Sequence, residues 1–359
     1  MAKNKKVIIS CAVTGAIHTP SMSEYLPVTA EEVIEHSLAA HEAGAAVLHL
    51  HARDEVDGHP TQDPEEFQKF LPTIQSSCDA VINITTGGGP QMTVEERMKP
   101  AMHFKPELAS LNMGSMNFGL FPMLKKHNQL KFPWEKEMLE RSKYSLFKNT
   151  FEDIENIMTL GYENGTRFEF ECYDVGHLYN LHYFHREGML KGPYFIQFVM
   201  GIMGGIGADT DNLLHMKKTA DKLFGDNYEW SVVGAGATQM RMNATGASLG
   251  SHVRVGLEDS LWDGPGKLAQ KNADQVKRVR DILEGLSLEV ATSDEARQML
   301  NLKGKDKPLD KTMMMFTLKD SKPGEPLLLH EEPIYLDDKI IGLSLIHISE
   351  PTRRTPISY

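Results

Sequence analysis

The amino-acid sequence predicts a closed (β/α)8 barrel with one insertion and a C-terminal extension. Short apolar runs rich in β-branched residues alternate eight times with longer segments of helical periodicity. The runs are apolar almost throughout, which is typical of parallel strands that are buried on both faces. Eight such strand–helix units favour a closed barrel over an open sheet.

The first half of the chain shows this repeat clearly. Residues 7–13 form the first apolar run, and Thr29 with Glu32 makes a capping box for a helix that extends to about Ala43. Pro64 fits the first turn of the next helix, since its ring fixes a helical φ angle. The remaining predicted elements of this half are strands at 46–51, 80–86 and 108–113 and a helix at 93–102.

The second half continues the repeat after an interruption at residues 118–150, which we interpret as an insertion after the fourth strand. Strands are predicted at 167–173, 194–200, 229–234 and 252–255. Helices are predicted at 151–164, 175–187, 209–224 and 267–286, and a further helix follows the strand at 229–234 and ends near Gly246. We therefore expect a barrel domain over 1–302. Residues 303–342 are predicted to be a C-terminal extension, and residues 343–359 a non-native or disordered tail.

Composition and charge exclude several classes of protein. The chain has 359 residues with 38 Lys and Arg against 49 Asp and Glu, so its formal net charge is −11. Without a long basic block, nucleic acid and anionic membranes are poor partners. No apolar run approaches the ~18 residues of a membrane span. The three distant cysteines, Cys11, Cys78 and Cys172, make a disulfide framework unlikely and favour a cytoplasmic location.

His49-Leu50-His51 at the end of the second predicted strand is the strongest local signal for chemistry. Residues two apart in a strand point to the same side, so both imidazoles should face the barrel mouth, where barrel enzymes keep their sites. Two neutral imidazoles suit a divalent metal, most often zinc. The alternative is a pair of histidines that are satisfied by hydrogen bonds alone.

Residues after the eighth predicted strand offer a third ligand. Strands two and eight both flank strand one in a closed barrel, so Glu258 can reach the two histidines from the other side. Asp259 beside it is a candidate base, and Arg254 at the strand end can bind a carboxylate through its fork of donors. The alternative for Glu258 and Asp259 is an acidic pair at a helix N-terminus.

Other strand ends carry polar groups that face the same mouth. Thr85, Thr86, Gly87 and Gly88 follow strand three, and such hydroxyl and N–H groups can hold an anionic oxygen. Asn112, Glu169 and Glu171 lie at the ends of strands four and five. Two inward carboxylates in that place require a cation or hydrogen-bond donors.

Taken together, these motifs resemble the β-keto acid cleavage enzyme family, over roughly residues 6–300. The order and separation of the motifs carry the resemblance. They are Thr14-Gly15-Ala16, Leu26-Pro27-Val28-Thr29, His49-Leu50-His51, Thr85-Thr86-Gly87-Gly88, Leu111-Asn112-Met113-Gly114, Phe170-Glu171, Gln197 to Gly201 and His252 to Asp259.

The resemblance implies a zinc-dependent barrel, a homo-oligomer (a tetramer in the family), that converts a β-keto acid and acetyl-CoA into acetoacetate and a new acyl-CoA. By position it implies His49, His51 and Glu258 as zinc ligands, Asp259 as the base and Arg254 as its support. Thr85, Ser110 and Glu171 match substrate-pocket positions. Family members with an aminated substrate carry Glu after Thr-Gly-Ala, but here that position is Ile17, which cannot pair with an ammonium group.

Two other functions stay open at this point. One is another metal-dependent barrel lyase or hydrolase, although amidohydrolases place their HxH motif on the first strand and need histidines at later strand ends. The other is a non-catalytic barrel that binds a small acid. Such a barrel would keep the metal and Arg254 but would have no use for Asp259.

Overall fold

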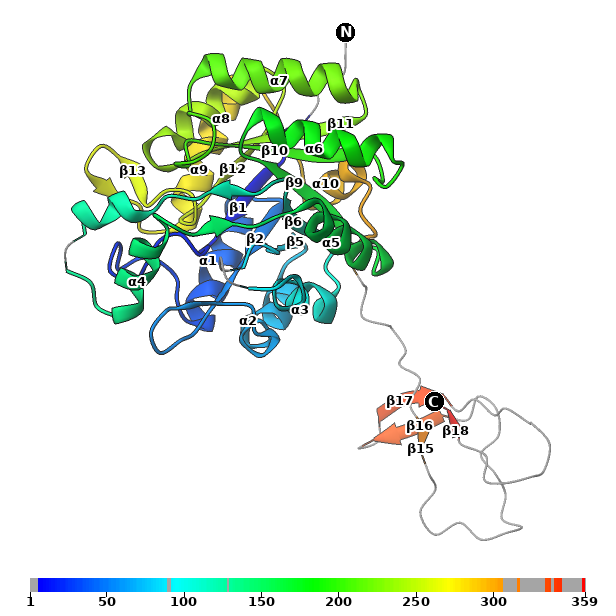
Figure 1. The fold of residues 1–359 in the computed structure, drawn as a ribbon. Coiled ribbons are helices and arrows are strands. Elements are labelled where there is room, and N and C mark those ends of the chain that lie inside the picture. The colour runs from blue at the N-terminus through cyan, green and yellow to red at the C-terminus, as the bar shows by residue number, and fades with distance from the viewer. Residues whose placement is uncertain are drawn as a thin grey trace, which may run out of the picture. The chain divides into compact units, whose positions relative to one another are not determined.

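The computed structural model describes residues 6–88, 92–127 and 129–305, and beyond them only the backbone of four short strands (Figure 1). Eight parallel strands close into a barrel in which each strand pairs with the next one of the repeat and β12 pairs back with β1. The predicted fold class is therefore confirmed. The barrel strands are β1 (Ile9–Ala12), β2 (Val47–Leu50), β5 (Val81–Ile84), β6 (Leu108–Asn112), β9 (Arg167–Cys172), β10 (Tyr194–Met200), β11 (Tyr228–Gly234) and β12 (His252–Val255).

Helices surround the barrel in Figure 1, and the apolar core lies between them and the strands. The capping box of Thr29 and Glu32 forms as predicted, and Gly44 ends the first helix with φ of 122°. The helices are α1 (Ala30–Ala43), α2 (Pro64–Ser77), α3 (Val94–Phe104), α5 (Phe151–Glu163), α6 (Val175–Arg186), α7 (Thr210–Phe224), α8 (Gln239–Ser248), α9 (Asn272–Gly285) and α10 (Ser293–Leu300).

Strand alternation places polar side chains inside the barrel toward its mouth, whereas the inward residues at the opposite end form an apolar cluster. In β12, Val253 and Val255 pack into the core outside the barrel, whereas Arg254 between them is buried on the opposite side of the strand. The same period places Glu169, in β9, away from the core that holds its neighbours Phe168 and Phe170. The strands thus deliver polar groups to the inside of the barrel.

Several short strands and helical segments outside the barrel strands were not predicted individually. Within the predicted insertion they are the 3-10 helix η1 (Phe121–Lys125), α4 (Pro133–Arg141) and β8 (Leu146–Phe147), and β8 pairs with β7 (Met116–Asn117), which lies just before the insertion. Another hairpin, β3 (Ala52–Arg53) with β4 (Pro60–Thr61), follows β2.

The helix predicted over 267–286 is wrong at its start. Residues 262–268 form the hairpin of β13 (Trp262–Gly264) and β14 (Lys267–Leu268), and α9 begins only at Asn272. The side chain of Asn272 explains this position of the helix start. Its amide accepts a hydrogen bond from Leu257 N and donates to the Val13 carbonyl, which ties α9 to the loops after β12 and β1.

The chain divides into two compact units, residues 1–304 and 305–359. In the second unit the structure describes β15 (Met315–Phe316), β16 (Pro333–Leu336), β17 (Lys339–Leu343) and β18 (Ile357–Ser358). The rest of the predicted extension at 303–342 beyond residue 305, and of the predicted tail at 343–359, lies outside the described residues. Among the described helices, none combines the length and apolarity that a membrane crossing needs.

Candidate active site at the barrel mouth

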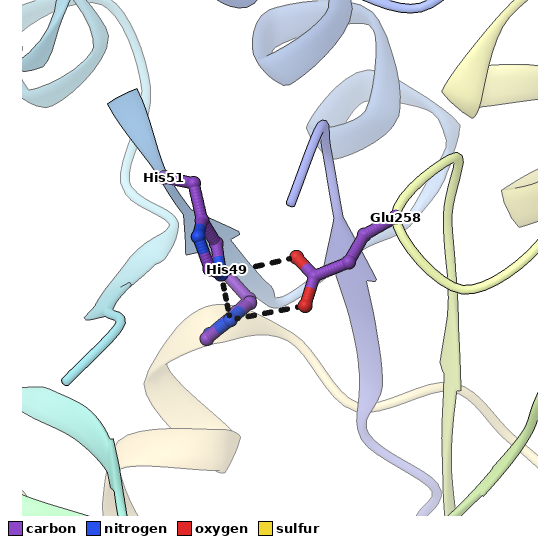
Figure 2. A group of neighbouring side chains, drawn as sticks. All are labelled: His49, His51 and Glu258. Carbon is purple, nitrogen blue, oxygen red and sulfur yellow. Dashed lines mark hydrogen bonds and ion pairs between the residues drawn. The ribbon is translucent and has the colours of Figure 1, made fainter. Parts of the chain in front are cut away.

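His49, His51 and Glu258 converge at the mouth of the barrel (Figure 2). His49 lies in β2 and His51 directly follows it, while Glu258 follows β12, on the other side of β1. The Nε2 atoms of the two histidines are 3.1 Å apart, and each lies 3.5 Å from a carboxylate oxygen of Glu258. All three side chains are buried.

The spacing and chemistry of these atoms fit one divalent ion. Two nitrogens at ~2.0–2.1 Å from a tetrahedral ion lie about 3.3 Å from each other, close to the separation of the two Nε2 atoms. Glu258 Oε2 is buried without a hydrogen-bond partner among the described residues, an arrangement that is costly unless a cation is present. Of the described residues, these are the only three whose His, Cys, Asp or Glu side chains group in this way.

A glycine turn brings Glu258 to this place. After β12 the backbone at Gly256 has φ of 142° and passes so close to β1 that an added Cβ would lie 2.7 Å from the carbonyl carbon of Ala12. A side chain cannot be accommodated there. The N–H of Glu258 then donates to the Ala12 carbonyl at 3.2 Å, which holds the turn across the end of β1 and aims Glu258 at β2.

Arg254 is a buried cation that contacts three carboxylates next to the histidines. Its Nε and Nη2 donate to the two oxygens of Asp259 at 2.9 and 3.1 Å, and Nη2 also donates to Glu258 at 2.7 Å. Its Nη1 faces Glu171 at 3.4 Å. Burial alone would lower the pKa of Arg254, but the surrounding carboxylates raise it well above its usual value, so the guanidinium stays charged.

The two adjacent carboxyl groups differ in their pKa values. Burial raises the pKa of Asp259 to about 6, because desolvation outweighs the attraction of Arg254. Burial acts on Glu258 in the same direction, but the two histidines and Arg254 hold its pKa well below the usual range. Glu258 is therefore a carboxylate at neutral pH, and Asp259 lies close to its titration point, as a proton-transfer group requires.

A polar network supports Arg254 from inside the barrel, and the sequence indicated only one of its members. Glu169, fully buried, accepts hydrogen bonds from Asn83 at 2.7 Å and from Gln197 at 2.6 Å. The side-chain oxygen of Gln197 in turn accepts a hydrogen bond from Arg254 Nη1 at 3.1 Å. Glu169 thus has the donors that an inward carboxylate requires. Asn83 lies in an apolar run, where an inward position on alternate residues was the only available signal, and Gln197 begins a motif of the family resemblance but was given no role.

The loop after β1 is fixed by a buried arginine that the sequence did not indicate. Arg53 donates to Thr14, Gly15 and His18, and its Nη1 donates to the Gly58 carbonyl. Burial lowers its pKa to about 10. The His18 ring donates through Nδ1 to the Leu257 carbonyl at 2.9 Å, which joins this loop to the turn that carries Glu258.

A cavity of about 410 Å³ opens beside these groups. Its wall includes Glu171, Arg254, Glu258 and Asp259, together with apolar side chains. The apolar part comes from the loop after β1, the insertion and the loops after β10, β11 and β12, and it includes Ile17, Met22, Met123, Ile202 and Leu261.

Other predicted site residues have local partners. Thr85 Oγ1 accepts from the Gly87 N–H at 3.0 Å, and Thr86 Oγ1 donates to the Ser110 carbonyl at 2.6 Å. Asn112 accepts from the Gly114 N–H. Gly88 has φ of 58° and lies against Arg97. Among the described residues that line the cavity, Glu171 is the only member of the predicted substrate-binding set.

The fold and this mouth define a (β/α)8 barrel in which three potential metal ligands and an Arg–Asp pair lie beside one cavity. Comparison with known proteins narrows the class. A sequence model of the beta-keto acid cleavage enzymes matches residues 6–302. A 3,5-dioxohexanoate:acetyl-CoA acetone transferase of Paraburkholderia graminis is 61% identical over 304 residues, which is 85% of this chain and 98% of that protein.

A 3-keto-5-aminohexanoate cleavage enzyme of Fusobacterium nucleatum is 34% identical over 300 residues, which is 83% of this chain and 99% of that protein. Among solved structures, the apo form of ObcA matches with a TM-score of 0.56 at 20% identity, covering 78% of this chain and 66% of that one, and this similarity concerns the fold. The chain belongs to the β-keto acid cleavage enzyme family. This membership disfavours the amidohydrolase and the non-catalytic alternatives.

Proposed function

We propose that this protein condenses a β-keto acid with acetyl-CoA and releases acetoacetate and a new acyl-CoA. The observation that carries the proposal is the Arg254–Asp259 pair and the His49, His51 and Glu258 triad beside one cavity. Family membership and the acetyl-CoA-dependent relative from Paraburkholderia graminis support it. A homo-oligomeric state, a tetramer by family resemblance, and a cytoplasmic location stay predictions.

The reaction balances without any redox step. Loss of a proton from C2 of R–CO–CH2–COO⁻ leaves a carbanion, which attacks the thioester carbonyl and displaces the CoA thiolate. The thiolate then adds to the R–CO carbonyl, and the bond from that carbon to C2 breaks. The products are R–CO–SCoA and acetoacetate, whose carbanion takes the proton back.

In this proposal Asp259 takes the proton from C2 and returns it at the end. Arg254 holds both Asp259 oxygens and so fixes the direction in which the base points. His49, His51 and Glu258 would hold a zinc ion, which supplies Lewis-acid stabilisation of the negative charge that develops on the keto and carboxylate oxygens. Thr85, Ser110 and Glu171 are proposed as substrate contacts. The same role is proposed for the other residues at these strand ends, Thr86, Gly87, Gly88 and Asn112.

The far end of the substrate is proposed to be uncharged. Ile17, Met22 and Leu261 line the cavity, so this part of the wall offers no partner for an ammonium group. A 3,5-dioxo acid of the kind in the name of the Paraburkholderia graminis relative fits such a wall. With that substrate the new thioester would be acetoacetyl-CoA, whereas a 5-amino substrate should be poor.

The path of carbon atoms tests this proposal. The protein is incubated with 3,5-dioxohexanoate, 3-oxohexanoate or 3-keto-5-aminohexanoate and with acetyl-CoA that carries ¹³C in both acetyl carbons, and the products are separated by mass spectrometry. We expect both labelled carbons in acetoacetate and none in the new acyl-CoA. Label in the acyl-CoA, or acetoacetate formed without acetyl-CoA, would contradict the proposal.

A further inference from the structure

The insertion places positive charge at the edge of the catalytic cavity. Residues 118–150 contain seven Lys and Arg and three Glu, a net charge of +4 in a chain whose net charge is −11. Residues 118–132 contain three lysines and no acidic residue. Lys126 lines the cavity that also holds Glu258 and Asp259. Lys125 and Lys126 are exposed, and neither forms an ion pair with a carboxylate of the described residues.

This basic segment is firmly attached to the barrel mouth. Leu120 and Met123 pack with Met22, Leu257 and Leu261 in one apolar cluster. Glu135 of α4 is buried and accepts hydrogen bonds from the backbone N–H of Ser21 at 2.9 Å and from its hydroxyl at 2.6 Å. Lys126 is therefore presented from a fixed support, which lowers the entropy cost of binding an anion there.

An exposed aromatic side chain lies at the same cavity. Trp262 of β13 lines it and is 42% exposed, whereas Trp side chains are highly buried on average. The same cavity is therefore lined by a lysine without a carboxylate partner among the described residues and by an exposed aromatic face. A lysine and an exposed indole are the groups with which proteins bind nucleotides, since lysine pairs with the phosphates and the base stacks on the indole.

We propose that Lys126 and Trp262 form the docking site for the nucleotide end of coenzyme A, with Lys126 on its phosphates and Trp262 against its adenine. The pantetheine arm would then follow the apolar wall of Met123, Ile202 and Leu261 toward Asp259. This inference rests on the proposed function, because it assigns the binding site of the acetyl donor in that reaction.

The test compares two acetyl donors that share the reacting thioester. Acetyl-CoA carries the nucleotide, whereas S-acetyl-N-acetylcysteamine ends before it. We expect Lys126→Ala and Trp262→Ala each to lower the ratio of kcat/KM for acetyl-CoA over kcat/KM for the short thioester by about fivefold or more. The Lys126→Ala effect should shrink as salt rises, because the contact with phosphate is exposed and screened.

Matched controls come from the same insertion. Lys136 pairs with Glu140 at 3.8 Å, and Tyr144 is 79% exposed, and neither lines the cavity. Lys136→Ala and Tyr144→Ala should leave the ratio at its wild-type value. An unchanged ratio in the Lys126 and Trp262 variants, or an equal loss with both thioesters, would overturn the docking site.

Binding of CoA measured by calorimetry separates this inference from the proposed function. If the wild-type protein forms no acetoacetate with either thioester, the proposed function fails, and the binding measurement alone decides the docking site. We expect CoA to bind about fivefold more weakly to each of the two variants than to the wild type. Equal affinity in all four variants and the wild type would refute the site.

Discussion

Gly15 offers a sharp test of how the metal site is built. It has φ of 65° and lies directly against Glu258, so that an added Cβ would overlap the Cγ atom and lie 2.8 Å from Cβ and Cδ of that residue. Gly15→Ala therefore adds one methyl group to the side of a proposed metal ligand. No atom of the ligand set itself is changed.

The size of the effect follows from these distances. To reach ordinary contact at 3.4 Å, Cβ and Cδ of Glu258 must each move by about 0.6 Å, and the overlapping Cγ atom must move further. Metal–ligand distances tolerate only about 0.2 Å, so the carboxylate leaves its bonding position. We expect zinc affinity to fall by about tenfold to a hundredfold, the loss that is typical when a residue that orients a metal ligand is changed. The left-handed backbone adds about 1–2 kcal/mol of strain.

Gly188→Ala separates strain from displacement, because Gly188 has φ of 70° with nothing within 4 Å of an added Cβ. Zinc affinity is measured by competition with a chromophoric chelator, and stability by thermal unfolding. Both variants should lose the stability that the left-handed backbone costs, Gly15→Ala more because of the overlap, but only Gly15→Ala should lose zinc affinity. Wild-type zinc binding in Gly15→Ala, or an equal loss in Gly188→Ala, would refute the reasoning.

Three further substitutions test the site from other sides. Asp259→Asn should keep stoichiometric zinc and lower acetoacetate formation by about 10²–10⁴-fold, and retained turnover would contradict its role as base. His49→Ala should lose the metal, so full zinc content by elemental analysis would reject the ligand set. Burial raises the pKa of Glu169 to about 7 from 4.5, so this group stabilises the fold at low pH and loses up to about 3 kcal/mol of that contribution as pH rises from about 4.5 to 7. Glu169→Gln should therefore flatten the dependence of the unfolding free energy on pH in that window, and an unchanged slope in denaturant titrations would argue against a protonated Glu169.

The barrel could be predicted from local sequence patterns, and the convergence of His49, His51 and Glu258 from the order of the barrel strands. The capping box at Thr29 and the apolar strand runs are patterns of neighbouring residues. His49 and Glu258 are far apart in sequence, but the closed order of strands places β2 and β12 on either side of β1. Barrel topology allowed Glu258 to reach the histidines, and the family resemblance favoured this arrangement over an acidic pair at a helix N-terminus.

The support of the site could not be predicted, because it depends on contacts between distant segments. Arg53 binds backbone carbonyls of the loop after β1, and a carbonyl group leaves no mark in the residue sequence. Asn272 holds two loops and thereby fixes the start of α9. The hairpin of β13 and β14, which carries Trp262, overlaps the start of the helix predicted from residue 267. The position of Trp262 at the cavity was therefore also missed.

The metal triad is tested most directly by anomalous diffraction at the zinc absorption edge from crystals of the zinc-loaded protein. We predict a single strong anomalous peak, bonded to Nε2 of His49, Nε2 of His51 and a carboxylate oxygen of Glu258 at ~2.0–2.2 Å. A peak at another place, or a Glu258 carboxylate that does not reach the ion, would contradict the proposed active site.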